Sequence, residues 1–132
     1  MTTVRLIQYE DAGPDVRAVY DDIMATRGSD WVNNFWKALA VHPPTLRETW
    51  ARVKAVMAPG ALDAVTKEML YVAVSAANNC AYCIHSHTAA ARRAGMSDAM
   101  YGELLAVVGL ANQTNALANA MQVPVDDRFR VS

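Results

Sequence analysis

The chain has 132 residues, of which 53% are hydrophobic, and its formal net charge at pH 7 is −1. This length suits one domain, and the hydrophobic fraction is high for so small a protein, so we expect a single domain over residues 1–132 that forms a homo-oligomer. The 12 basic residues are scattered, which argues against a nucleic-acid partner. The longest apolar runs are shorter than the ~20 residues that span a bilayer, which argues against a membrane partner.

Hydrophobic residues recur with the helical period along nearly the whole chain, so the sequence predicts an all-α fold, a bundle of about six helices. Most of the predicted helices begin at a proline or a capping Ser, Asp or Asn, and end at a Gly, Asn or Pro signal. In chain order, the predicted helices cover residues 14–28, 29–42, 44–58, 64–77, 80–94 and 98 to about 121. A short tail, 125–132, follows them.

Three predicted helix ends bear on function. Asp63 is the expected cap of the fourth helix, and Asn79 is the expected N-cap of the fifth, which places Cys80 at its first position and Cys83 in its first turn. His42 is expected at the end of the second helix, just before a pair of prolines, where a cation suits the helix dipole.

Both cysteines and two of the three histidines lie between residues 80 and 87. Cys80, Cys83 and His87 share one face of the predicted helix, and the Cβ atoms of Cys83 and His87 are expected roughly 5–6 Å apart. His85 points to the other side. A thiol near a helix N-terminus has a pKa well below the free value of ~8.5, and a neighbouring imidazole can accept its proton. Such a thiolate can attack a peroxide to give a sulfenic acid, which the second cysteine converts to a disulfide.

Glu68 immediately precedes the apolar stretch 69–77 and lies twelve positions before the first cysteine. An antiparallel return after the Asn-Asn turn could bring its carboxylate over His87 and orient the imidazole as a base. Pairing with Lys67 or exposure to solvent is the alternative for this carboxylate. Ser86 hydrogen-bonds either within the site or back to its own helix.

The cysteine pair has two other interpretations. In the first, Cys80, Cys83 and His87 hold zinc, with Glu68 or His42 as the fourth ligand. In the second, the two thiols are buried and inert. We favour redox chemistry, because a second C-x-x-C segment of the kind that completes structural zinc sites is missing from the sequence. The N-terminal stretch lacks the basic start and apolar core of a secretory signal, so we expect a cytoplasmic protein.

Glu68, Cys80, Cys83 and His87 form the pattern E-x11-C-x2-C-x3-H. This pattern resembles the alkylhydroperoxidase D-like branch of the carboxymuconolactone decarboxylase superfamily, most strongly over residues 35–94. The resemblance implies an all-α subunit that assembles into dimers, trimers or hexamers. It also implies a thiol-dependent peroxidase that reduces hydroperoxides without a metal or cofactor and is reset by an external reductant, a thiol protein or a small dithiol.

The same resemblance assigns roles to the site residues. It implies that Cys83 forms the sulfenic acid, that Cys80 donates a proton and then resolves it, and that Glu68 and His87 relay protons. Tyr82 lies between the cysteines, where the best-described peroxidase of the family has a histidine. Tyrosine is a poor base near neutral pH, which bears on the efficiency of peroxide reduction rather than on the dithiol chemistry.

Two rival functions stay open at the level of sequence. One is a decarboxylase or lactone-processing enzyme of the other branch of the superfamily, whose members typically lack the cysteine pair. The other is a non-enzymatic helical module, either stabilised by a metal or sensing redox state for a partner protein.

Overall fold

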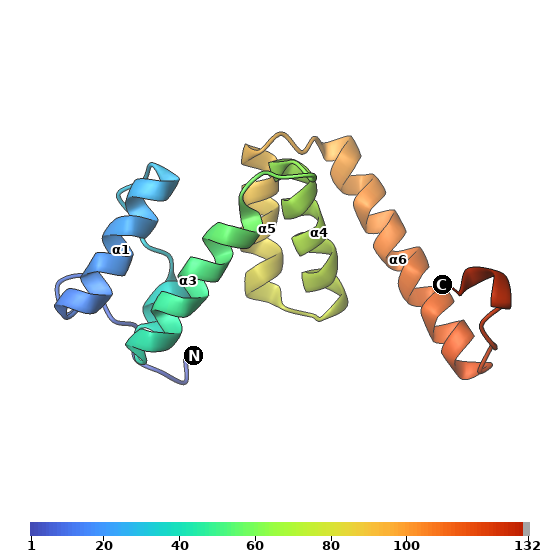
Figure 1. The fold of residues 1–132 in the computed structure, drawn as a ribbon, viewed down its shortest axis with the longest axis horizontal. Coiled ribbons are helices and arrows are strands. Elements are labelled where there is room, and N and C mark those ends of the chain that lie inside the picture. The colour runs from blue at the N-terminus through green and yellow to red at the C-terminus, as the bar shows by residue number, and fades with distance from the viewer. Residues whose placement is uncertain (131–132) are drawn as a thin grey trace. The chain divides into compact units, whose positions relative to one another are not determined.

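The structure is a computed structural model of the chain, and it describes residues 1–130. These residues form six α-helices and one short 3-10 turn and contain no β-strand, which confirms the predicted all-α fold (Figure 1). The helices are α1 (Pro14–Arg27), α2 (Asn34–Leu39), α3 (Pro43–Met57), α4 (Ala64–Ala77), α5 (Ala81–Arg93) and α6 (Asp98–Ala120), and the 3-10 turn is η1 (Asp127–Phe129).

The chain divides into two compact units, residues 1–58 and the residues from 59 onward. The first unit holds α1 to α3, and the second holds α4 to α6. The single domain expected over residues 1–132 stays a prediction. The end of the predicted tail, residues 131 and 132, lies outside the described residues.

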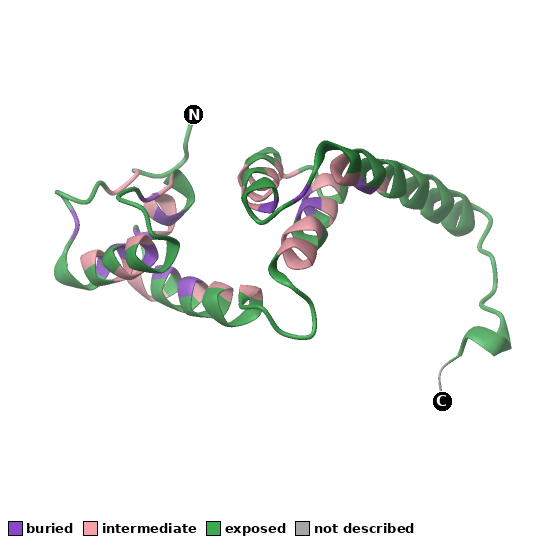
Figure 2. Cartoon of the chain, turned by 90° about the horizontal axis from the view of Figure 1, so that it is seen from above, coloured by how far each residue is buried: buried purple, intermediate pink, exposed green. Residues whose placement is uncertain are grey.

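The first unit is built around one hydrophobic core, to which α1, α2 and α3 all contribute. Helix α1 contributes Val16, Tyr20 and Ile23 to this core, and Tyr20 and Ile23 are fully buried. They meet Leu46 and Trp50 of α3, while Trp36 of α2 stacks edge-on against Trp50. Figure 2 marks the buried positions of the chain in purple, many of them on these helices.

The second helix is shorter than the predicted range 29–42. It begins only after Asn33, which has extended backbone angles, and the preceding Val32 is buried in the core from a non-helical segment. Burial of Val32 thus overrides the helical pattern of the residues before Asn34.

His42 belongs to the start of α3 rather than to the end of α2, so its predicted place is wrong. It is the N-cap of α3, and its Nδ1 accepts a hydrogen bond from the backbone N–H of Thr45 at 3.4 Å. Pro43, not Pro44, opens the helix, because the first helical position needs no backbone N–H.

The second unit packs α4 against both α5 and α6. Asp63 caps α4 as predicted, since its carboxylate accepts a hydrogen bond from the Thr66 N–H at 2.8 Å. The hydrogen bonds from Thr66 lower the pKa of the Asp63 carboxyl. Ser97 caps α6 in the same way, through the Met100 N–H at 3.1 Å.

The turn between α4 and α5 differs from the prediction, and this turn positions the cysteines. Asn79 has a φ of 55°, in the left-handed region that asparagine enters more easily than most residues. Its N–H bonds the Ala76 carbonyl at 3.2 Å, and the Cys80 N–H bonds the Ser75 carbonyl at 3.0 Å, which together form a Schellman ending. The predicted cap at Asn79 is therefore wrong: Cys80 is the N-cap, and Cys83 is the third residue of α5.

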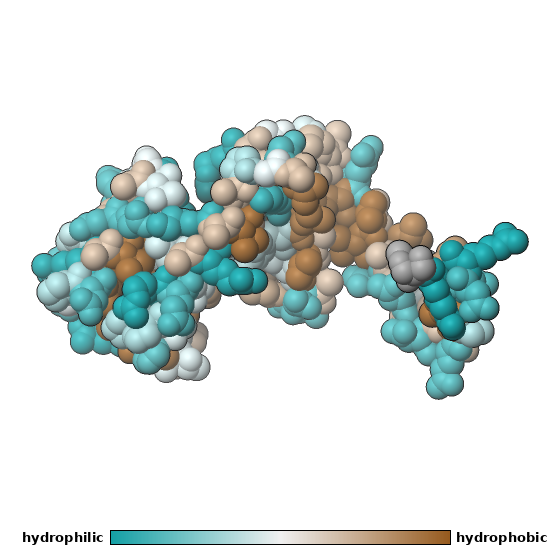
Figure 3. Space-filling model, viewed as in Figure 1, coloured by the Kyte–Doolittle hydropathy of each residue, from teal (hydrophilic) through white to brown (hydrophobic). Residues whose placement is uncertain are grey.

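Most of α6 is exposed, and Leu104 is its only buried residue. Several large apolar side chains further along the helix are at least half exposed, including Val107, Leu110 and Leu117. Figure 3 shows such apolar surface over α4 and along α6. Within residues 1–130, no helix combines the length and the apolar character that crossing a membrane requires.

We predict that Asn79→Ala lowers the free energy of unfolding by about 1 kcal/mol, because alanine is strained in the left-handed region. Asn79→Gly is expected to change it little, since glycine adopts that conformation freely. Asn78→Ala is the matched control, as Asn78 has an ordinary φ of −87°. Urea unfolding measures all three, and an equal loss for Asn78→Ala and Asn79→Ala would contradict the explanation.

Candidate active site

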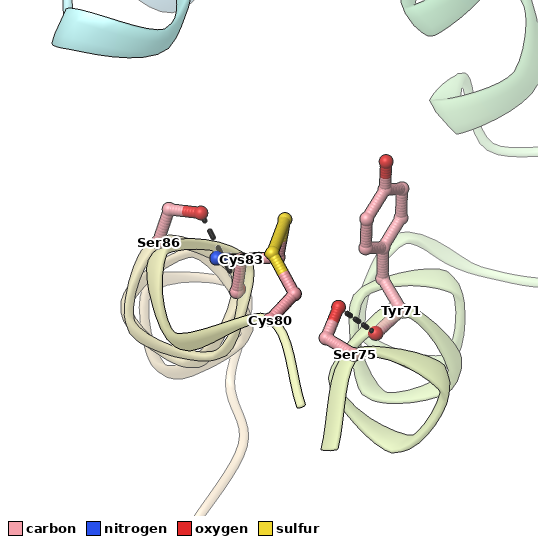
Figure 4. The surroundings of a disulfide bond; sticks show 5 residues. All are labelled: Tyr71, Ser75, Cys80, Cys83 and Ser86. Carbon is pink, nitrogen blue, oxygen red and sulfur yellow. Dashed lines mark hydrogen bonds between the residues drawn. A yellow bond between two sulfur atoms is a disulfide. The ribbon is translucent and has the colours of Figure 1, made fainter. Parts of the chain in front are cut away.

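The two cysteines lie at the beginning of α5. Cys80 is the N-cap, and its Sγ accepts a hydrogen bond from the Cys83 N–H at 3.3 Å. The two residues are joined by a disulfide, with their Cα atoms 5.3 Å apart, a separation that a disulfide bridges readily. Both are partly buried, and Figure 4 shows the sulfur pair on the side of α5 that faces α4.

Glu68 and His87 form the second part of the site. Glu68 comes from α4 and His87 from α5, and His87 Nδ1 donates a hydrogen bond to Glu68 Oε2 at 2.7 Å. The two side chains are only 19% and 23% exposed. The expectation that the return of α5 brings Glu68 to His87 is confirmed. Because the carboxylate occupies Nδ1, the nitrogen left for proton exchange in the neutral ring is Nε2.

Helix α5, which carries residues of both parts, also determines where the other polar residues of the site lie. Cys83 and His87 are one turn apart within α5, which puts their Cβ atoms roughly 5–6 Å from each other. Ser86 donates a hydrogen bond to the Cys83 carbonyl at 3.3 Å. Of the two predicted alternatives, the structure therefore shows the bond back to its own helix. His85 is exposed, away from the partly buried His87.

Tyr71 is a site residue that sequence reasoning missed. Its ring stacks on the His87 imidazole, with ring centroids 3.6 Å apart and planes 17° from parallel. Figure 4 shows Tyr71 among the residues around the disulfide, and the Ser75 hydroxyl donates to the Tyr71 carbonyl at 2.7 Å. The sequence does contain a signal for Tyr71, because the spacing of Glu68, Tyr71 and Ser75 places all three on one face of α4.

The zinc interpretation finds no support in the arrangement of donors. Among residues 1–130, no group of three or more His, Cys, Asp and Glu side chains is placed to hold a metal ion. The two sulfurs bond to each other, and His87 Nδ1 is occupied by Glu68. His42, the alternative fourth ligand, bonds locally to Thr45.

The chain is similar to known proteins, and to one solved structure over its whole length. Residues 43–126 match the model of the carboxymuconolactone decarboxylase family. The crystal structure of an alkylhydroperoxidase AhpD core from Rhodospirillum rubrum superposes with a TM-score of 0.96 at 58% identity, covering 100% of this chain and 99% of that one.

A second relative is a Paracoccus denitrificans protein described as uncharacterized protein 4 in the cox locus. It is 37% identical over 67 residues, which are 51% of this chain. The matched region spans 60% of that relative, so the likeness to it covers less than two thirds of its length.

We predict that Glu68→Ala lowers the free energy of unfolding by about 1–2 kcal/mol, because His87 loses its partly buried acceptor. It also lets the neutral imidazole carry its proton on either nitrogen, whereas Glu68→Gln keeps an acceptor oxygen and the Nδ1-protonated form. Nitrogen-15 NMR of His87 at about pH 8 distinguishes the two forms. Glu48→Ala, which removes an exposed acid of α3, is the control. An unchanged His87 spectrum in Glu68→Ala would contradict the predicted role of this contact.

Proposed function

The chain belongs to the carboxymuconolactone decarboxylase family, in its alkylhydroperoxidase D-like part, and from this premise we propose that it is a thiol-dependent peroxidase. It reduces organic hydroperoxides through a dithiol/disulfide cycle of Cys80 and Cys83. Glu68 and His87 form the proton relay. The solved relative, 58% identical over the whole chain, is described as an alkylhydroperoxidase core, which supports an oxidoreductase of this class.

The observation that carries the proposal is the disulfide between Cys80 and Cys83 at the start of a helix. The two sulfurs lie within bonding reach on the framework that also holds His87. In the reduced protein, the backbone N–H groups of the first turn of α5 and the positive end of its dipole stabilise a thiolate. The disulfide is then the oxidised end of the cycle.

The proposed reaction balances as follows. The Cys83 thiolate attacks the terminal oxygen of the hydroperoxide, the O–O bond breaks, and the alkoxide leaves as an alcohol after taking a proton from the relay. Cys83 becomes a sulfenic acid. The Cys80 sulfur then attacks the Cys83 sulfur, the S–S bond forms, and the S–O bond breaks to release water. The dithiol has lost two electrons, and an external thiol reductant restores them.

The Glu68–His87 hydrogen bond gives the relay a fixed orientation. With Nδ1 donating to the carboxylate, Nε2 takes the proton of a thiol and later returns it to the leaving oxygen. Tyr82, 43% exposed between the cysteines, offers a phenolic hydroxyl and no imidazole. The relay therefore depends on His87. Because the disulfide must be reduced after each turnover, the proposal places the protein in a reducing compartment such as the cytoplasm.

The rival function is a decarboxylase or lactone-processing activity, the kind of activity after which the family is named. The cysteine pair discriminates between the two, because neither decarboxylation nor lactone chemistry needs a dithiol. Activity of this kind that survives replacement of both cysteines by serine would favour the rival.

Self-association is part of the proposal, and α6 supplies the surface for it. Val107, Leu110, Leu117 and Met121 are 50% exposed or more and fall within an arc of about 80° on the helix. With Thr114 they repeat at alternating steps of three and four residues, the spacing of a coiled-coil seam. We call these five positions the α6 seam. Its occupant in the proposal is a second copy of this chain.

We predict that the reduced protein loses both of its thiols when treated with one equivalent of an organic hydroperoxide, while an equal amount of the alcohol is formed. Cys83→Ser is expected to reduce peroxide only at the background rate, because the nucleophile is gone. Cys80→Ser is expected to stop at the sulfenic acid, one oxygen heavier than the reduced chain. Thiol titration and intact-mass measurement follow both events. Native thiols that stay unreactive toward the peroxide would rule out the proposed cycle.

We predict that Leu110→Glu shifts the protein toward the monomer, because it places a charge in the α6 seam. Asn112→Glu is the matched control, since Asn112 lies on the opposite side of the same helix, about 160° away from Leu110. Size-exclusion chromatography with light scattering measures the mass of each species. A monomeric parent protein, or equal effects of the two substitutions, would argue against the seam as the contact.

A further inference from the structure

Two side chains of α4 hold the same imidazole from two directions. Glu68 binds the edge of His87 at Nδ1, with 2.7 Å between nitrogen and oxygen. Tyr71, three residues further along α4, covers one face of the same ring at 3.6 Å between centroids. The Glu68 hydrogen bond fixes which nitrogen carries the proton, but it leaves the ring free to tilt about that bond. The near-parallel contact with Tyr71, at 17°, fixes the plane of the ring.

The exposure of Tyr71 argues that this contact has a role other than core packing. The side chain is 39% exposed, in contrast to Val72 beside it, which is fully buried. A large aromatic side chain on the surface, stacked on an imidazole and placed beside a disulfide, contributes less to the hydrophobic core than to the position of its neighbours (Figure 4).

We propose that Tyr71 is a positioning residue: its ring holds the His87 imidazole in the plane from which Nε2 serves the dithiol of Cys80 and Cys83. This inference rests on the proposed peroxidase function, in which His87 moves the proton. The ring of Tyr71, and not its hydroxyl, performs the role, because the contact is between the faces of two rings. Tyr71 and Glu68 thus divide the task between them, one setting the plane and the other the protonated nitrogen.

The test compares the parent protein with Tyr71→Phe, which keeps the ring, and Tyr71→Leu, which removes it. Tyr101→Leu is the matched control, because it removes an aromatic ring from α6 that packs on Arg92 instead of His87. NMR of the His87 ring protons reports the stack through the ring-current shift, and nitrogen-15 shifts report the tautomer. The value of kcat/KM for an organic hydroperoxide reports the reaction, and urea unfolding reports stability.

In Tyr71→Leu we expect the ring-current shift to disappear and kcat/KM to fall about threefold to tenfold, while the Nδ1-protonated tautomer stays because Glu68 is intact. Tyr71→Phe and Tyr101→Leu are expected to stay within about twofold of the parent in kcat/KM. A Tyr71→Leu protein with the kcat/KM of the parent would overturn the proposal. So would a Tyr71→Phe protein as impaired as Tyr71→Leu, which would assign the role to the hydroxyl.

The two proposals fail separately. If the parent protein does not react with the peroxide at all, the peroxidase function fails. The His87 spectra of the same variants, recorded without peroxide, then still decide whether Tyr71 positions the imidazole. If the parent reacts but its His87 ring protons show no ring-current shift, the Tyr71 proposal alone fails.

Discussion

The site depends on one backbone constraint, the left-handed conformation of Asn79. It ends α4 with two hydrogen bonds and lets the chain reverse within two residues. Cys80 thereby has two structural roles: its N–H completes the end of α4, and its sulfur caps the beginning of α5. A longer or looser connection would uncouple the sulfur from both helices. Instead, the cysteine pair is held by the same turn that packs α5 against α4.

The antiparallel packing of α4 and α5 then brings together residues that are far apart in sequence. Glu68 and His87 are 19 positions apart, and their hydrogen bond spans the two helices in a partly buried environment. In such surroundings a charge-assisted hydrogen bond is stronger and more directional than at an exposed surface. One face of α4 thus contacts the His87 imidazole, and the helix that carries this imidazole, α5, begins with the two cysteines. The four residues of the proposed cycle, Glu68, Cys80, Cys83 and His87, all come from α4, from α5 or from the N-cap of α5.

Hydrophobic periodicity predicted the helices well where a whole face is buried or regularly capped, as in α1 and α4. It failed for residues 29–33, because Val32 reaches the core from a non-helical segment, and a hydrophobic pattern does not distinguish such a position from a helical one. Asn79 was misplaced for a related reason: asparagine favours both the N-cap and the left-handed region, and only the hydrogen bonds around it decide. The meeting of Glu68 with His87 was predictable from motif spacing, whereas the Tyr71 stack depends on the rotation of α4 against α5.

The disulfide joins residues only three positions apart. Chain-entropy arguments give a cross-link of so short a loop about 2 kcal/mol of stabilisation, less than half of the ~4.7 kcal/mol for a loop of 100 residues. Most of the conformational entropy of the denatured chain is therefore the same whether this bond is closed or open. Helix packing, rather than the covalent link, holds α4 and α5 together, so the bond is suited to repeated opening and closing with little effect on the architecture around it.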